Sequence, residues 1–510
     1  MIPDTNFSRA HGGCSRMRSA FFGLACALAL PQLVTAQSGP STVRLEPLSV
    51  GAFSEIGMLQ GGRFGPSVTF SDEWVDNFGA YMMQQGSVDD RWFFRVGMGG
   101  IFQFQKPEEI NAEWGGTQTR NFFAGPTVAD IEYEVLESGT RSWRVGLGLF
   151  SYKYNRDAAN LGEYLFRAGP YPTYIMTGGY SFINSASAPL QGLKSRYQAG
   201  NFTFDAFLVT ETVMPPLYDL SLAGVVKYRM LDGAVDLGAG VNLKRLVPIR
   251  PSRTQLRDEF NNNAYFTGPD GEQYSGNLSY YRNERDFYRQ DTVRYAAEYQ
   301  RARARFDSVS AWTATGGSYS PDYSYYSQAG VVVSVTAAVD LKKFLPATSL
   351  LGDDDLRVFA EAAVLGVKNY PVFYENRSER MPVMLGINLP GFGLLDLVTV
   401  QYEYFASPHR NSYLESIQSN GATPDFVASN DRILSRDAYA DGLKKDDHSW
   451  SVLVRKNVTR GVTFSLQAAR DHARMVSHAF YAGPGLAPQA IFYTTDKQNW
   501  YWMAQFSFGI

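Results

Sequence analysis

The chain has little cysteine, no long apolar run beyond its N-terminus and no excess of one charge sign. Its two cysteines, Cys14 and Cys26, both lie within the first 36 residues, so the rest of the chain excludes a disulfide scaffold and thiol chemistry. After residue 36, no stretch reaches the roughly 18 consecutive apolar residues that a transmembrane helix needs. The net charge of −3 gives no indication of nucleic-acid binding.

The first 36 residues have the features of a secretory signal peptide. Arg16 and Arg18 precede an apolar run over residues 20–30, and the small-residue segment 34–36 supplies a cleavage site. Met17 is an alternative start, because residues 17–36 alone form a complete signal. Gly23 lies three residues before Cys26, where a lipoprotein signal has a larger aliphatic residue. We therefore predict export without lipidation.

Aromatic residues are abundant, at 14% of the chain, and they concentrate in the C-terminal segment. There the apolar side chains fall on alternate positions, at Trp500, Trp502, Ala504, Phe506, Phe508 and Ile510. Alternation of this kind is typical of a β-strand with one apolar face. We predict that this strand exposes Trp500, Trp502, Phe506 and Phe508 to lipid.

The same alternation recurs along the chain and predicts a meander of antiparallel strands. It is present over residues 92–104, 129–135, 143–149, 220–229, 235–244, 331–341, 356–364, 383–389, 398–404, 450–454 and 462–468. Short connections alternate with long ones if 153–189 forms one outer loop or an inward-folded segment. A first strand near 48–58 and a short turn near 301 between two further strands belong to the same meander, and the pattern of connections predicts a total of about 18 strands, within a range of 16–20.

These features resemble bacterial outer-membrane β-barrels, whose closing strand typically ends in an aromatic residue; this chain ends in Ile510, with Phe508 on the same face. In size the chain resembles large porins and exopolysaccharide-export barrels. The resemblance implies an all-β fold with a single transmembrane antiparallel barrel, short periplasmic turns and long extracellular loops. It also implies the outer membrane of a diderm bacterium, its lipid and the barrel-assembly machinery as partners. We predict a signal peptide over 1–36, a short periplasmic N-terminus over 37–46 and the barrel over 47–510.

Charged residues on the polar face of these strands are candidates for the lumen, because charges inside a membrane barrel need water or partners. The main candidates are Arg95, Arg144, Lys227, Arg229, Lys244, Glu132, Glu134, Asp236 and Glu361. Further candidates are Arg294, Arg303, Arg305, Arg357, Arg455, Asp130, Asp205, Glu298, Asp307, Asp340 and Glu403. Cations and anions balance, so no strong ion selectivity is expected. Cross-strand pairs that only stabilise the wall are the alternative interpretation.

The longest connection, residues 247–290, is rich in tyrosine, asparagine and glycine. We predict that it lies outside the cell and folds partly over or into the lumen, with Tyr265, Phe266, Tyr274, Tyr280 and Tyr281 as constriction contacts. Exposed tyrosines beside polar residues would also suit contact with carbohydrate. Packing of one loop onto another, or a place in the interfacial girdle of the barrel, is an equally open interpretation.

No motif indicates an enzyme, a cofactor or a metal. His409, His448, His472 and His478 lie at strand ends or in loops without a nucleophile or metal-ligand pattern around them. The sequence therefore predicts a channel for small hydrophilic solutes or for an exported polysaccharide. The alternative is a closed barrel whose outer loops act as an adhesin or glycan-binding surface. The oligomeric state is not predicted.

Overall fold

The structure is a computed structural model, and it describes most of the chain after residue 41. The described residues are 42–59, 62–64, 68–70, 73–103, 121–167, 188–210, 219–247, 255–256, 265–267, 273–275, 278–314, 326–327, 329–346, 350–367, 376–406, 447–470, 492–493 and 500–509. The predicted signal peptide and the leader up to residue 41 lie outside these residues.

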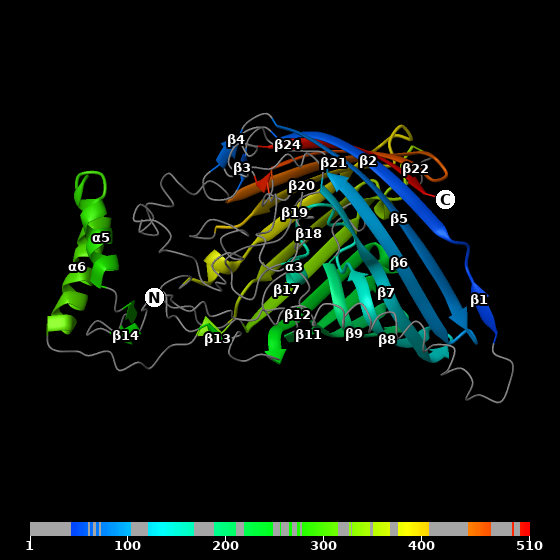
Figure 1. The fold of residues 1–510 in the computed structure, drawn as a ribbon, viewed down its shortest axis with the longest axis horizontal. Coiled ribbons are helices and arrows are strands. Elements are labelled where there is room, and N and C mark those ends of the chain that lie inside the picture. Colours follow the sequence, from blue (N-terminus) through cyan, green and yellow to red (C-terminus); the bar gives the residue numbers. More distant parts are fainter. Residues whose placement is uncertain are drawn as a thin grey trace, which may run out of the picture.

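A closed antiparallel β-barrel of 16 strands forms the molecule (Figure 1). The last strand pairs with the first, with Phe506 opposite Ser54, so the ring has no free edge. The strand β1 (Val43–Leu45) pairs with the end of β5 outside the ring. The ring consists of β2 (Ser49–Leu59), β5 (Glu73–Val88), β6 (Trp92–Gln103), β7 (Asn121–Ser138), β8 (Arg141–Tyr152), β9 (Ala188–Ala199), β10 (Phe202–Thr210), β11 (Leu220–Met230), β12 (Val235–Val247), β17 (Gly330–Asp340), β18 (Arg357–Val364), β19 (Val383–Leu389), β20 (Leu397–Tyr404), β21 (His448–Thr459), β22 (Val462–Arg470) and β24 (Tyr501–Gly509).

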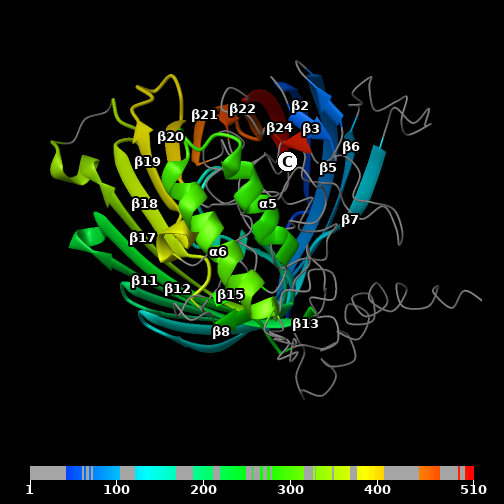
Figure 2. The ribbon, with the colours of Figure 1, turned by 90° about the vertical axis from the view of Figure 1, so that its left-hand side faces the viewer.

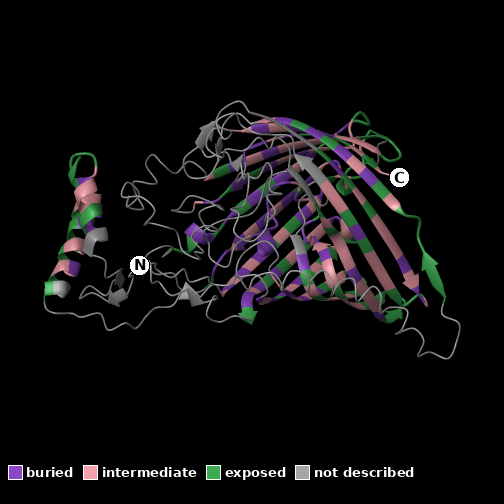
Figure 3. Ribbon diagram, in the orientation of Figure 1, coloured by how far each residue is buried: buried purple, intermediate pink, exposed green. Residues whose placement is uncertain are grey.

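Buried and exposed residues alternate along the strands (Figure 3). The buried positions are polar and the exposed ones apolar, which is the reverse of the pattern in a soluble protein. On β18, Glu361 is buried whereas Val358 is 40% exposed. On β20, Gln401 is buried whereas Tyr402 is 43% exposed. Large apolar side chains are normally the ones removed from water. An apolar outer face around a polar interior is instead the pattern of a barrel surrounded by lipid.

The connections alternate between the two ends of the barrel, which confirms the predicted meander. Tight turns such as 139–140 and 460–461 lie at one end, named here the short-turn end. The strand ends that are joined through residues 153–187, 248–329 and 405–447 lie at the other, the long-connection end. The region that the sequence left as an outer loop or an inward-folded segment is a single connection between β8 and β9.

One part of the predicted meander is wrong: the two strands expected around residue 301 are a helix. The connection between β12 and β17 contains the helices α5 (Leu278–Arg289) and α6 (Ala296–Ala314), which form a hairpin. The predicted lumen charges Arg294, Glu298, Arg303, Arg305 and Asp307 therefore belong to this hairpin and its turn, not to the wall. Neither of these two predicted strands is part of the wall, and the 16 strands of the wall lie within the predicted range of 16–20.

The helical hairpin lies beyond the long-connection end of the barrel. Figure 1 shows it separated from the strands along the long axis, and Figure 2 shows it in front of the barrel. Among the described residues, no helix is both long and apolar enough to cross a membrane.

Short elements complete the described part of the chain. Three two- or three-residue pairings lie outside the ring: β3 (Gly62–Phe64) with β4 (Val68–Phe70) and β23 (Phe492–Tyr493), β13 (Gln255–Leu256) with β16 (Tyr326–Ser327), and β14 (Tyr265–Thr267) with β15 (Gln273–Ser275). The 3-10 turns are η2 (Leu231–Gly233), η3 (Leu341–Phe344) and η4 (Arg377–Arg380). The four-residue helix α3 (Tyr164–Arg167) lies inside the barrel and contacts β12, β17 and β18.

Candidate functional site

Residues 153–167, named here the inner segment, leave the end of β8 and cross the interior to the far wall. The Asn155 amide donates to Glu361 Oε2 on β18 at 2.8 Å, and the Leu161 N–H donates to Gln401 Oε1 on β20 at 3.1 Å. The Asn242 amide on β12 donates to the Leu165 carbonyl at 3.0 Å. Since these partners are spread over several strands of the barrel, the segment is fixed within the ring rather than lying over its rim.

Glu361 is the main anchor of the inner segment. Besides Asn155, its carboxylate accepts bonds from the Tyr154 hydroxyl and from the N–H groups of Glu163 and Tyr164, the last two at 3.0 Å. The N–H groups at the start of a helix have no partner within the helix. A carboxylate at that end of α3 satisfies them and carries the favourable charge sign. A single buried side chain therefore holds both the loop and the start of the helix.

Glu163 lies next to this anchor in a strained conformation. Its φ is 61°, in the left-handed region, and Gly162 before it has φ 86°. Its Oε1 accepts from the Asn155 N–H, whereas no described residue donates to its Oε2. Burial, reinforced by the charge of Glu361, raises the pKa of Glu163 to about 8. The inner segment thus holds a buried carboxyl group that binds its proton near neutral pH.

Lys153 lies at the start of the same segment and is affected by burial in the opposite direction. Burial lowers the pKa of Lys153 to about 8, although the nearby charge of Glu163 favours its protonated form. Two groups of the inner segment therefore titrate in the same pH range.

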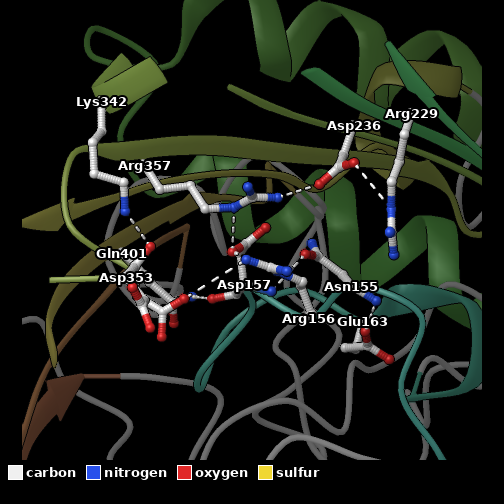
Figure 4. A network of polar contacts seen from close by, with 11 residues as sticks. Asn155, Arg156, Asp157, Glu163, Arg229, Asp236, Lys342, Asp353, Arg357 and Gln401 are labelled. Carbon is white, nitrogen blue, oxygen red and sulfur yellow. Dashed lines mark hydrogen bonds and ion pairs between the residues drawn. The ribbon is translucent and has the colours of Figure 1, made fainter. Parts of the chain in front are cut away.

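A chain of ion pairs ties the inner segment to the short-turn end of the wall (Figure 4). Arg357 on β18 donates from Nε to Asp157 at 2.6 Å and from Nη2 to Asp236 on β12 at 2.5 Å. Arg229 on β11 lies 3.7 Å from the other oxygen of Asp236. Because the Arg357 side chain is only 4% exposed, water does not solvate its charge, and the carboxylates of Asp157 and Asp236 compensate it instead.

Aromatic side chains of the inner segment also pack against the wall of the barrel. The Phe166 ring makes edge contacts with Tyr152 at 5.6 Å and with Phe207 on β10 at 5.7 Å between ring centres. Tyr164 is fully buried, and its hydroxyl donates to Glu403 on β20 at 2.6 Å. Burying one such ring contributes about 1.5–3 kcal/mol. The segment is therefore part of the packed interior of the barrel.

The nine main lumen candidates from the sequence all lie on barrel strands. Glu361 and Asp236 belong to the network that holds the inner segment, together with Arg229, and Lys244 is buried on β12. Arg95 pairs with Asp130, Glu132 pairs with Lys194, and Arg144 pairs with Glu134. Lys227 lies 5.7 Å from the centre of the Tyr152 ring.

Two lumen cations on β9, Lys194 and Arg196, were not among the predicted candidates. Lys194 pairs with both Asp130 and Glu132, and Arg196 pairs with Asp205. Their spacing of two residues was the available signal. For the inner segment, the alternation of short and long connections indicated a single outer loop or an inward-folded segment over 153–189. It did not identify Tyr154, Asn155, Glu163 or Tyr164 as contact residues.

The predicted constriction residues occupy a different part of the molecule from the inner segment. Tyr265 and Phe266 are in β14, Tyr274 is in β15, and Tyr280 and Tyr281 are in α5. Of these side chains only that of Tyr281 is described, and it is buried. In the described part of the chain, the element that enters the barrel is 153–167, whereas α5 lies outside it (Figure 1).

The predicted lipid-facing residues lie on β24 and immediately before it. Phe506 and Phe508 are 49% and 50% exposed, and Trp502 is partly exposed. Trp500 precedes the strand and lies 6.3 Å from Trp450 between ring centres. On the opposite face, Gln505 is buried and donates to Glu55 Oε1 at 2.6 Å.

The closed antiparallel ring, the apolar outer face and the polar interior together define an outer-membrane β-barrel architecture. No protein-family model and no curated protein matches the chain. Among solved structures, a triple mutant of the Rhodopseudomonas blastica porin has a TM-score of 0.39 and 8% identity, covering 92% of this chain and 100% of the porin. Another mutant of this porin has a TM-score of 0.38 and 9% identity, with the same coverage. Likeness at this level carries no argument about function.

Proposed function

We propose that the protein is a non-enzymatic outer-membrane channel for small hydrophilic solutes, narrowed by the inner segment. A ring of 16 strands is too wide for wall side chains alone to fill. The observation that carries the proposal is the inner segment, which is anchored across that ring by Glu361. A segment held in this way limits the size of the solutes that can pass and does not block the lumen.

The location follows from the outer face. Its alternating exposed apolar residues would be costly in water and are suited to lipid. The short-turn end then faces the periplasm and the long connections face outward, as in other barrels of this kind. We expect the protein in the outer membrane of a diderm bacterium, migrating differently on a gel with and without boiling. Recovery as a soluble species would contradict this location.

Replacing residues 154–166 by a short glycine-serine linker tests the channel directly. We expect the variant to assemble, because no wall hydrogen bond between strands passes through these residues, and to show a higher single-channel conductance in planar bilayers. Liposome-swelling assays with sugars of increasing size should show a relaxed size limit. The point variant Glu361→Ala keeps every residue of the segment and should show noisier, intermittently larger openings.

Two results would contradict this function. The wild-type protein, assembled and heat-modifiable, could give no conductance steps. Alternatively, the linker variant could leave conductance and size limit unchanged. An exported polysaccharide remains the other cargo for this architecture, and block of the current by a long glycan chain would support it over small solutes.

The helical hairpin supports a second candidate, a surface adhesin. It lies outside the barrel (Figure 2) and carries the exposed arginines Arg282, Arg289, Arg301 and Arg303. Exposed guanidinium groups bind acidic groups of surface glycans well. Binding of purified protein to acidic glycans, combined with an absence of conductance steps, would favour this function over the channel.

A further inference from the structure

Strands β6 to β11 carry a group of cations on their inner faces. We name it the cationic patch; its members are Arg95, Arg144, Lys194, Arg196 and Lys227. Neighbouring strands supply carboxylates: Arg95 Nη2 lies 2.6 Å from Asp130, Arg144 Nε 3.1 Å from Glu134, and Arg196 Nε 2.7 Å from Asp205. Counted as charges, these pairs are balanced.

The arginine side chains of these pairs are more exposed than their carboxylate partners. The side chains of Arg95, Arg144 and Arg196 are 41%, 41% and 50% exposed. Their partners Asp130, Glu134 and Asp205 are 1%, 6% and 1% exposed. The guanidinium groups therefore cover the carboxylates, and an ion in the barrel meets the positive groups first. Because the interaction between charges falls with distance, the covering charge dominates.

Arg144 and Arg196 form the centre of the patch. They face each other in register on β8 and β9, at a position where side chains start about 5 Å apart. The carboxylates that pair with them, Glu134 and Asp205, lie on the two strands that flank β8 and β9, namely β7 and β10. The Arg144 guanidinium carbon lies 4.4 Å from the centre of the Phe93 ring, which fixes its orientation. Two adjacent guanidinium groups match the paired oxygens of a carboxylate or phosphate.

Gly146 keeps the wall beside this pair flat. A Cβ there would lie 2.9 Å from Lys194 Cε and 2.8 Å from Glu132 Cγ. The Lys194 side chain can therefore cross β8 and reach both Asp130 and Glu132 on β7. Lys194 and Arg95 together neutralise these two carboxylates. The exposed guanidinium groups of Arg144 and Arg196 do not take part in that cluster, and each pairs with a single carboxylate of its own.

We propose that the cationic patch is a binding surface for oxyanionic solutes, with the Arg144–Arg196 pair as its centre, and that passage through the barrel favours anions. This inference rests on the proposed channel function. The competing explanation is that the ion pairs only stabilise the wall, in which case the equal charges give no selectivity.

A charge-neutral pair variant separates the two explanations. Glu134→Gln combined with Arg144→Gln removes one cation and one anion, so the net charge is unchanged. We expect the wild type to show an anion-selective reversal potential in a KCl gradient, and the pair variant to lose much of that preference. Arg141→Gln, which removes a cation from the outward-facing parity of the same strand, is the control and should leave the preference unchanged.

Inorganic phosphate serves as the probe of the binding surface itself. It should block the wild-type chloride current at concentrations about tenfold lower than in the pair variant, as expected when one charge-assisted contact is lost. The double variant Arg144→Lys with Arg196→Lys keeps the charge but not the bidentate geometry. It should retain anion preference with weaker phosphate block, and it provides a readout if the pair variant fails to assemble.

The outcomes are distinct from those of the channel proposal. Absence of any conductance in assembled wild-type protein would contradict the channel. Conductance without anion preference or phosphate block, or a pair variant that behaves as the wild type, would overturn the binding surface alone.

Discussion

At the scale of single residues, Glu361 is the position on which the inner segment depends most. Replacing it by alanine leaves the N–H groups of Glu163 and Tyr164 and the Asn155 amide without their acceptor. Each buried donor left in this way costs about 1–3 kcal/mol. We expect Glu361→Ala to leave the barrel assembled while hydrogen exchange over residues 153–167 becomes much faster.

The matched control for Glu361 is Glu137→Ala at the exposed end of β7. It removes the same charge without touching the inner segment. Equal exchange over 153–167 in both variants would show that Glu361 does not anchor the segment.

Glu163 gives the inner segment a pH dependence. Its pKa rises from 4.5 to about 8 when the segment is in place, because burial and the charge of Glu361 disfavour the carboxylate. The segment in place therefore holds a proton that the released segment loses, and its stability falls as pH rises from about 4.5 to about 8.

Lys153 acts in the next pH range. Burial lowers its pKa from 10.5 to about 8, so the released segment holds more protons above about pH 8, and the stability of the segment in place rises again. We predict a minimum near pH 8, visible as a maximum in current noise or in segment exchange corrected for intrinsic rates. Glu163→Gln should remove the fall below pH 8 and leave the rise above it. A flat profile in the wild type would contradict this mechanism.

At the scale of elements, the closing strand β24 tests the assignment of inner and outer faces. Phe506 is 49% exposed, and the centre of its ring lies 4.8 Å from that of Phe464 on the outer face. Gln505 points inward and donates a hydrogen bond to Glu55. A lipid-facing arginine at mid-membrane costs about 2–4 kcal/mol. We expect Phe506→Arg to reduce the heat-modifiable folded fraction strongly, and Gln505→Arg to reduce it little, since an arginine there meets the Glu55 carboxylate. Equal defects would mean that the two faces are wrongly assigned.

The alternation of apolar residues predicted most strands of the wall, although not β5, β9 and β10, and it was wrong for α6 for a local reason. Arg301, Arg303 and Arg305 alternate with small or apolar neighbours and so imitate the period of a strand. The same residues, with the alanines around them, are strong helix formers, and that preference decides the structure where no wall partner exists. Composition should therefore have outweighed the short alternation here.

The inner segment could be located from the sequence only in part. Short and long connections alternate along the chain only if residues 153–189 stay on one side of the membrane or fold inward. Its anchor could not be found in the same way, because Glu361 is 198 residues from Glu163 along the chain. On β18 a buried glutamate looks the same in sequence whether it faces water, a cross-strand cation or the backbone of a distant loop.

At the scale of the whole molecule, the position of the constriction distinguishes the structure from the sequence-based expectation. The sequence placed it in the connection that contains α5, whereas the described element that crosses the barrel is the inner segment. The hairpin of α5 and α6 packs on itself, through the pair of Arg305 with Glu284 at 3.5 Å and of Arg285 with the Phe306 ring at 4.1 Å. Residues 278–314 should therefore be removable without loss of the wall.

We expect replacement of residues 278–314 by a short flexible linker to leave assembly and single-channel conductance close to those of the wild type, because the hairpin lies beyond the end of the barrel (Figure 1). Replacement of 154–166 should raise the conductance in the same assay. If instead the hairpin variant gives the larger rise and the inner-segment variant none, the sequence-based assignment of the constriction to the long connection is right. A rise in both variants would mean that the two elements narrow the path in series, because resistances along one conduction path add.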